Sequence, residues 1–270
     1  MEDFPAALEV RGLCKRYRHF TAVDEVSFSV GDGEVFGLLG PNGSGKSSTL
    51  HSITGVVEPT AGSITIGWAD AGTPEAKRLT GFVPDDLALP TSLTGREYLA
   101  LLASLHRTSS AERRDFLVDA FRLRPALGKL LGEYSHGMKR KLQLVGALLH
   151  APRLLILDEP FQGLDPQATV MVRTIIELLT SDGGAVLVAT HDLRAAQEYC
   201  GRVAILAAGR VVASGAPAAL CEQHGRPSLE EVFLAVTGLE PATSAFRAAL
   251  ERLLRGEPAP VAGSLVAKAC

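Results

Sequence analysis

The sequence predicts an α/β fold built on a mostly parallel β-sheet. Short apolar runs that fit buried strands, at 154–158, 185–189 and 203–206, alternate with segments of helical periodicity. Such alternation is typical of parallel strands covered by helices on both faces. A glycine-rich stretch at 40–48 also stands between an apolar run, 34–39, and the start of a helical segment. Since loops at the carboxyl ends of parallel strands bind ligands, we expect the functional site at that edge of the sheet.

The N-terminal segment predicts a different kind of sheet. Polar and apolar residues alternate through 8–16 and again through 23–30, and 63–66 adds a further strand-like run. Alternation with period two indicates strands with one buried face and one solvated face. We therefore expect an N-terminal antiparallel β subdomain, an edge sheet ahead of the glycine-rich stretch.

The middle of the chain predicts helices inserted into this α/β core. Apolar residues recur at helical spacing from 94 to about 149. We expect one domain over 1–240, with a helical subdomain inserted at roughly 86–150. Residues 241–270 lose this rhythm, and we expect them to form a C-terminal extension with one short amphipathic helix and a mobile tail.

Composition excludes several classes of function. The 270 residues are 46% hydrophobic and 21% charged, with a formal net charge of −3, so no general attraction to nucleic acid is expected. No apolar stretch approaches the roughly 18 residues of a membrane span, and the first residues lack the pattern of a secretory signal. The four cysteines form no C-x-x-C pair. These features predict a cytoplasmic protein without a cysteine metal site.

The glycine-rich stretch GPNGSGKSS fits the pattern G-x-x-x-x-G-K-[ST]. Backbone N–H groups of such a loop close around nucleotide phosphates, with the Lys46 ammonium reaching the β- and γ-phosphates and the Ser47 hydroxyl holding Mg²⁺. The alternative is a glycine-rich turn that binds nothing. The predicted phosphate-binding residues are Gly40, Pro41, Asn42, Gly43, Ser44, Gly45, Lys46, Ser47 and Ser48.

The run LLILDEP at 154–160 predicts a second part of the same site. A buried strand that ends in Asp158 delivers a carboxylate to the sheet edge where Mg²⁺ would bind. Glu159 follows directly and could polarise the attacking water. The alternative is an acidic turn that serves only solubility. Together, the loop and this run predict binding and hydrolysis of Mg²⁺-ATP.

Over residues 8–238 the chain resembles the ATP-binding cassette (ABC) ATPases. The segment YSHGM at 134–138 looks like a variant of the LSGGQ signature of that family, with Ser135 and Gly137 retained and the Leu, first Gly and Gln replaced. A hydroxyl and a glycine N–H at a helix N-terminus suit a γ-phosphate, although an ordinary helix cap has the same residues.

The resemblance assigns roles to four further residues. Tyr17, in KRYRHF, occupies the place of the aromatic residue that stacks on adenine. Asp165, in GLDP, matches the loop that contacts the opposing subunit, and His191, in VATHD, matches the switch histidine that reaches the γ-phosphate. Asp85, in GFVPDD, stands where the family usually has the Gln that touches Mg²⁺ and senses the membrane partner.

The same resemblance implies partners. Two cassettes would pair head to tail, with each ATP between one phosphate loop and the opposite signature, and we expect a homodimer. A separate membrane permease would dock near residues 85–102, on the cytoplasmic face of the membrane. The segment PSLEEVFLAVTG resembles the ABC-2-type and drug-export branch, which favours an exporter. Two alternatives stay open: a non-transport ABC ATPase acting on a macromolecular complex, and a weakly catalytic nucleotide-binding scaffold.

Overall fold

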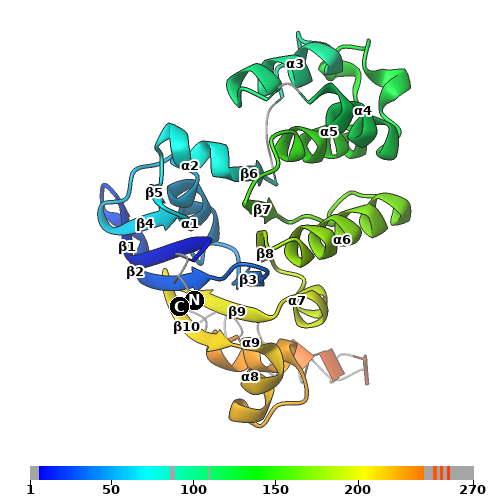
Figure 1. Ribbon diagram of the computed structural model, residues 1–270. Coiled ribbons are helices and arrows are strands. Elements are labelled where there is room, and N and C mark those ends of the chain that lie inside the picture. The colour runs from blue at the N-terminus through cyan, green and yellow to red at the C-terminus, as the bar shows by residue number, and fades with distance from the viewer. Residues whose placement is uncertain are drawn as a thin grey trace.

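A central sheet organises the computed structural model, which describes residues 6–85, 89–108, 110–239, 246–247, 250–251 and 254–255. In this part of the chain the sheet has six strands in the order β10-β9-β3-β8-β7-β6 (Figure 1). All neighbouring pairs are parallel except β9 and β10. The strands are β3 Val35–Leu39, β6 Thr80–Val83, β7 Leu154–Asp158, β8 Ala185–Thr190, β9 Arg202–Ala207 and β10 Arg210–Gly215.

A second, antiparallel sheet packs against the first. Its order is β2-β1-β4-β5, so it is a sheet of its own rather than an edge of the parallel one. Helix α1, Lys46–Ile53, shares its core: Leu50 of this helix packs in one cluster with Val10 of the second sheet and Phe36 of the central sheet. The strands are β1 Leu8–Tyr17, β2 Phe20–Val30, β4 Ala61–Ile66 and β5 Ala69–Asp70.

Three helices follow β6 and lie together at one end of the molecule (Figure 1). The first begins with a capping box, in which Thr94 Oγ1 accepts from Glu97 N and the Glu97 carboxylate accepts from Thr94 N. The region is helical, as its periodicity predicts. The helices are α3 Gly95–Leu105, α4 Ala111–Ala120 and α5 His136–Leu148, with short 3₁₀ turns at Arg124–Ala126 and Leu131–Glu133.

Apolar side chains join this helical segment to the central sheet. Leu99, Val118 and Leu142 belong to the same buried cluster as Leu155 of β7 and Val186 of β8. Helix α5 therefore packs directly behind the strands that carry the acidic residues. The boundaries 1–240 and 86–150 stay predictions.

The remaining helices pack on the two sheets. Helices α8 and α9 pack on β9 through Leu220, Leu229 and Val232, and neither helix was predicted from the sequence, nor were α2, β5 and β10. Of the helix predicted within the C-terminal extension, at 245–254, residues 246–247, 250–251 and 254 are described and are helical, and the predicted tail lies wholly outside the described residues. The helices are α2 Pro74–Leu79, α6 Pro166–Ser181, α7 Leu193–Tyr199, α8 Pro217–His224 and α9 Leu229–Val236.

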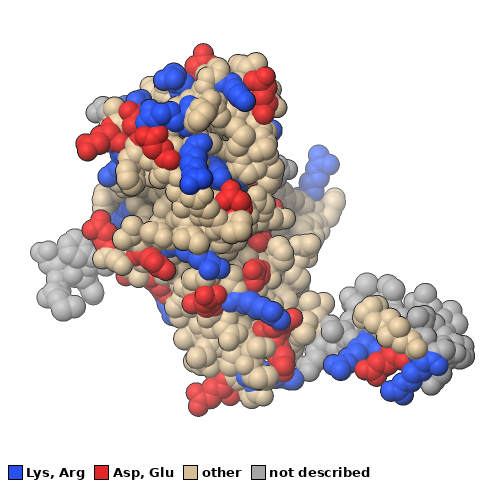
Figure 2. Space-filling view, turned by 90° about the vertical axis from the view of Figure 1, so that its right-hand side faces the viewer, with Lys and Arg blue, Asp and Glu red and all other residues tan. Residues whose placement is uncertain are grey.

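Two global features bear on function. Among the described residues, no helix combines the length and the apolar character that crossing a bilayer requires. On the face in Figure 2, Lys and Arg are interspersed with Asp and Glu. Mixed charges of this kind produce no extended field of one sign on that face.

Candidate functional site

The phosphate loop connects β3 to α1 at the carboxyl edge of the central sheet. Gly45 has a φ of 105°, and a Cβ at this position would collide with the carbonyl oxygen of Ala22. Only glycine adopts this conformation without strain. Within the loop, Ser44 N donates to the Pro41 carbonyl over 3.1 Å. The loop is thereby closed into a tight cradle whose shape depends on its glycine.

Two polar groups of this cradle are suited to an anion. The Lys46 ammonium donates to the carbonyls of Gly40 and Pro41, which keeps it inside the loop. Burial lowers the pKa of Lys46, and the carboxylates of Glu159 and Asp158 oppose that shift. The Ser44 hydroxyl is buried and has no hydrogen-bond partner among the described residues. A buried donor of this kind gains a partner when a phosphate oxygen enters the loop.

A cavity of about 420 Å³ lies against the loop. It brings eight of the nine predicted phosphate-binding residues, all but Gly40, together with three of the predicted acidic residues, Asp85 after β6 and Asp158 and Glu159 at the end of β7. This volume is within the usual range for small-molecule sites. The lining residues are Phe20, Ala22, Pro41, Asn42, Gly43, Ser44, Gly45, Lys46, Ser47, Ser48, His51, Pro84, Asp85, Asp158 and Glu159.

Asp158 ends β7 and is partly buried. Burial raises the pKa of its carboxyl group, and the negative charges of Asp85 and Glu159 raise it further, while a hydrogen bond from the Asp85 backbone amide lowers it. No group of three or more His, Cys, Asp or Glu in the described ranges could hold a metal ion by itself. Mg²⁺ is often held by one or two carboxylates together with phosphate oxygens, and Asp158 with the Ser47 hydroxyl fits that requirement.

Glu159 is the most tightly fixed acidic side chain of the site. Its Oε1 accepts from the backbone N of His191 over 2.9 Å and lies 2.6 Å from His191 Nδ1, and its Oε2 accepts from Thr190 Oγ1 over 2.9 Å. Its backbone has a φ of 48°, in the left-handed region that non-glycine residues rarely adopt. The loops after β7 and β8 thus orient one carboxylate toward the cavity edge.

The structure does not bring the signature residues to this cavity. Ser135 caps α5 by accepting from Met138 N, and Gly137 lies beside the Gly163 carbonyl. Asp165 accepts from Lys141 Nζ over 2.6 Å. These contacts group the signature with the loop after β7, apart from the phosphate loop of the same chain.

Phe20 is an aromatic residue that sequence reasoning missed. It lines the cavity, whereas Tyr17, its partner across the β1–β2 hairpin, has its ring near Lys15 Nζ and is not among the described residues around the cavity. The proximity of the two aromatic residues in the sequence was the available signal. The adenine-stacking role of Tyr17 stays a prediction.

Comparisons with known proteins agree with this geometry. Residues 23–162 match the family model described as ABC transporter. The chain is 38% identical over 84% of its length to Nod factor export ATP-binding protein I of Rhizobium leguminosarum bv. viciae, covering 75% of that protein. It is 33% identical over 87% of its length to linearmycin resistance ATP-binding protein LnrL of Bacillus subtilis (strain 168), covering 76% of that protein.

Solved structures give the same result. An ATP binding subunit of an ABC transporter superposes with a TM-score of 0.81 at 36% identity, covering 86% of this chain and 99% of that one. A dimeric ATP-binding cassette bound to ADP and Pi shares the fold, with a TM-score of 0.70 at 24% identity, over 77% of this chain and 98% of that one. The predicted family and fold class are confirmed. The chain belongs to the ABC transporter family, as an ATP-binding subunit that hydrolyses ATP.

Proposed function

We propose that this chain is the ATPase subunit of an exporter, acting on the cytoplasmic face of the cell membrane with a separate permease. The observation that carries the catalytic part is the placement of the Glu159 carboxylate. It is held by His191 and Thr190 at the cavity that the phosphate loop also lines. The direction of transport follows from the relatives, which are named for Nod factor export and for linearmycin resistance.

Each residue of the site then has a distinct task. The loop amides and Lys46 bind the phosphates, and Glu159 accepts a hydrogen bond from the attacking water and aligns it. His191 supports Glu159 and lies at the same edge of the sheet. Ser47 and Asp158 would hold Mg²⁺, with Asp85 beside them, and the ion would neutralise charge on the β- and γ-phosphates. The Glu159 carboxylate is held before substrate arrives, so little reorganisation is needed in the reaction.

A second copy of the chain completes the site in this proposal. Ser135, Gly137 and Asp165 lie away from the cavity of their own chain, so they are free to face the nucleotide of a partner. Such pairing is isologous, since each copy offers the same two surfaces. The related cassette with ADP and Pi is a dimer. We propose a homodimer that closes on ATP and opens after hydrolysis.

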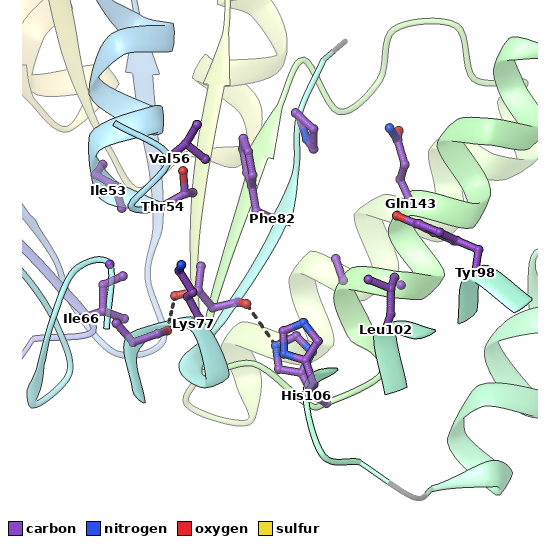
Figure 3. A pocket seen from close by; sticks show the side chains of 17 residues that line it. Ile53, Thr54, Val56, Ile66, Lys77, Phe82, Tyr98, Leu102, His106 and Gln143 are labelled. Atoms are coloured by element: carbon purple, nitrogen blue, oxygen red, sulfur yellow. Dashed lines mark hydrogen bonds between the residues drawn. The ribbon is translucent and has the colours of Figure 1, made fainter. Parts of the chain in front are cut away.

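The permease docking site is proposed to be an apolar groove of about 370 Å³ between the sheet and the helical segment. In Figure 3, Thr54 and Phe82 lie on one side of the groove, and Tyr98, Leu102 and Gln143 of the helical segment lie on the other. The groove adjoins Pro84, directly before Asp85. A helix of the permease that inserts its apolar side chains here would contact both parts of the subunit.

Substitution of Glu159 tests the catalytic assignment. Glu159→Gln should keep ATP affinity, because the phosphate loop is untouched, and lose turnover by at least about 100-fold, because the amide cannot polarise water. Equilibrium titration with ATP and phosphate release measure the two quantities. Glu230→Gln, on the exposed start of α9, is the matched control. Ordinary turnover in Glu159→Gln would show that another group polarises the water.

Substitution on α3 tests the groove. Leu102→Glu places a charge inside the groove, whereas Leu105→Glu places it on the exposed face of the same helix. Co-purification with the proposed permease should be lost in the first variant and kept in the second. Equal recovery of both complexes would exclude the groove as the docking site.

A further inference from the structure

We propose that Arg140 is a positioning residue for ATP hydrolysis, whose guanidinium fixes the backbone that carries the three acidic side chains of the cavity. The inference rests on the proposed function, because it takes Asp158 and Glu159 as the carboxylates that act in the reaction. Arg140 lies in the second turn of α5 and is 2% exposed. It does not line the cavity, so it acts through the residues that do.

The guanidinium bonds to carbonyl oxygens from two loops. Nη1 donates to Pro84 O at the end of β6, and Nη2 donates to Asp158 O and, over 2.8 Å, to Glu159 O at the end of β7. The two strands are neighbours, with Val83 paired to Leu157. A planar fork of N–H donors is able to satisfy acceptors on two loops at once. Arg140 therefore sets the position of the segment after β6, which carries Asp85, relative to the end of β7, which carries Asp158 and Glu159.

The conformation of Glu159 explains why such an anchor matters. With a φ of 48°, its peptide is in a region that costs roughly 1–3 kcal/mol for a non-glycine residue and persists only when its surroundings fix it. The backbone N donates to Ala189 O over 2.8 Å, and the side chain is held by the loop after β8. The carbonyl accepts from Arg140 Nη2 over 2.8 Å and, over a longer 3.2 Å, from Gln162 N of the same loop, so Arg140 is its partner from outside the loop. Without Arg140, the carbonyl keeps, among the described residues, only the bond from Gln162 N, which moves with the loop, so the peptide is able to relax and turn the Glu159 carboxylate away from its position.

The surroundings of Arg140 favour a role in the site over a role in packing alone. Its Nε is buried and has no hydrogen-bond partner among the described residues. Burial lowers the pKa of the guanidinium, and the charges of Asp85, Asp158 and Glu159 oppose this shift. A buried cation bonded mainly to neutral carbonyls stabilises a fold poorly, and an apolar side chain of similar volume serves packing as well. What the cation supplies is directed bonds to the acidic loops.

Four variants of the full chain test the proposal. Arg140→Gln removes the cation and the fork, and Arg140→Lys keeps a cation that cannot reach both loops. Lys139→Gln removes a neighbouring cation of α5 that has no hydrogen bond or ion pair in the described structure, and Glu159→Gln reports on the proposed function itself. The measurements are kcat, the dissociation constant of ATP by equilibrium titration, and the melting temperature.

We expect kcat to fall about 10- to 100-fold in Arg140→Gln, the usual range for residues that orient a reacting group. The dissociation constant of ATP should change less than about two-fold, because Arg140 touches no residue of the phosphate loop. Arg140→Lys should retain an intermediate kcat, and Lys139→Gln should match the unmodified chain. If Arg140→Gln does not fold, Arg140→Lys tests the proposal alone: its kcat should fall while its dissociation constant for ATP stays unchanged.

Two results would overturn the proposal. In the first, both Arg140 variants keep kcat while Glu159→Gln loses it, which leaves the proposed function standing without Arg140. In the second, kcat, ATP affinity and melting temperature fall in parallel in Arg140→Lys, which assigns Arg140 to the fold only. Full turnover in Glu159→Gln would instead refute the catalytic assignment on which the inference rests.

Discussion

Acid should destabilise this subunit through His150, which lines the apolar groove. The ring of His150 stacks on His106 with centroids 3.8 Å apart, and its Nε2 lies 3.0 Å from Thr80 O. A carbonyl accepts only, so Nε2 carries the proton and the buried Nδ1, which has no partner among the described residues, carries none. Protonation of Nδ1 would place a charge in an apolar space.

The sign of the effect follows from the pKa. Burial lowers the pKa of His150 from 6.5 to about 4, helped by His106 directly after α3 and by Arg113 on α4, while the hydrogen bond to Thr80 O opposes the shift. Lys77 of α2 lines the same groove and adds positive charge. Above pH 6.5 the ring is neutral in the folded and the unfolded chain. As the pH falls from 6.5 toward 4, only the unfolded chain takes up the proton, so the free energy of unfolding decreases.

The magnitude is accessible to measurement. A solution at pH 5 lies about 1.5 units below the pKa of histidine in the unfolded chain. This difference lowers the free energy of unfolding by roughly 2 kcal/mol. Solvent screening of this partly exposed ring reduces the loss to about 1 kcal/mol. For a chain of this size, that is a decrease of about 2–4 °C in melting temperature.

The assay compares melting temperatures at pH 7.5 and pH 5 in the unmodified chain and in His150→Gln. Glutamine keeps a donor for Thr80 O and has no proton to gain, so the variant should lose about 2–4 °C less than the unmodified chain on acidification. His19→Gln, at an exposed position, is the control and should behave as the unmodified chain. The reasoning is refuted if His150→Gln and the unmodified chain lose the same number of degrees.

Three further predictions concern the cavity. Phe20→Ala should weaken ATP binding about 5- to 10-fold in an equilibrium titration, because one base-stacking contact is lost. Tyr17→Ala should weaken it less, and a larger effect of Tyr17→Ala would show that adenine stacks on Tyr17. Gly45→Ala should abolish binding of a fluorescent ATP analogue, since a Cβ meets Ala22 O, and tight binding would contradict that steric argument. Thr190→Val should lower kcat by roughly 10-fold with ATP affinity kept, because it frees one oxygen of Glu159, and an unchanged kcat would show that His191 suffices.

Much of the site could be predicted because phosphate chemistry restricts residue types. A loop that wraps an anion needs glycines, as the φ of 105° at Gly45 shows, and an acidic residue at a strand end needs an apolar run before it. Both requirements leave patterns in consecutive residues. The alternation of strands and helices from β7 to β9 followed from the same patterns, since buried parallel strands are almost wholly apolar.

Other parts could not be predicted because their cause lies in the tertiary structure. Strand β10 is defined by its pairing with β9. Helices α8 and α9 did carry local signals that were not used: Pro217 and Gly225 at the two ends of α8, and Ser228 as the N-cap of α9. Arg140 is one basic residue in a helix with several, and its partners lie 56, 18 and 19 positions away. A single side chain that meets carbonyls so distant in the sequence leaves no pattern to read.

Helix α5 connects the signature residues with the acidic residues of the cavity. Ser135 caps its N-terminus and Gly137 lies in its first turn. Its second turn places Arg140 against the backbone of Asp158 and Glu159, and Lys141 binds Asp165 in the loop after β7. A helix of 13 residues moves as one body, so a shift of its N-terminus displaces all of these contacts together. A partner that moves the signature would thereby also move the backbone of the hydrolytic carboxylate. Closing of the dimer and alignment of Glu159 would then be one event, because a single rigid element takes part in both.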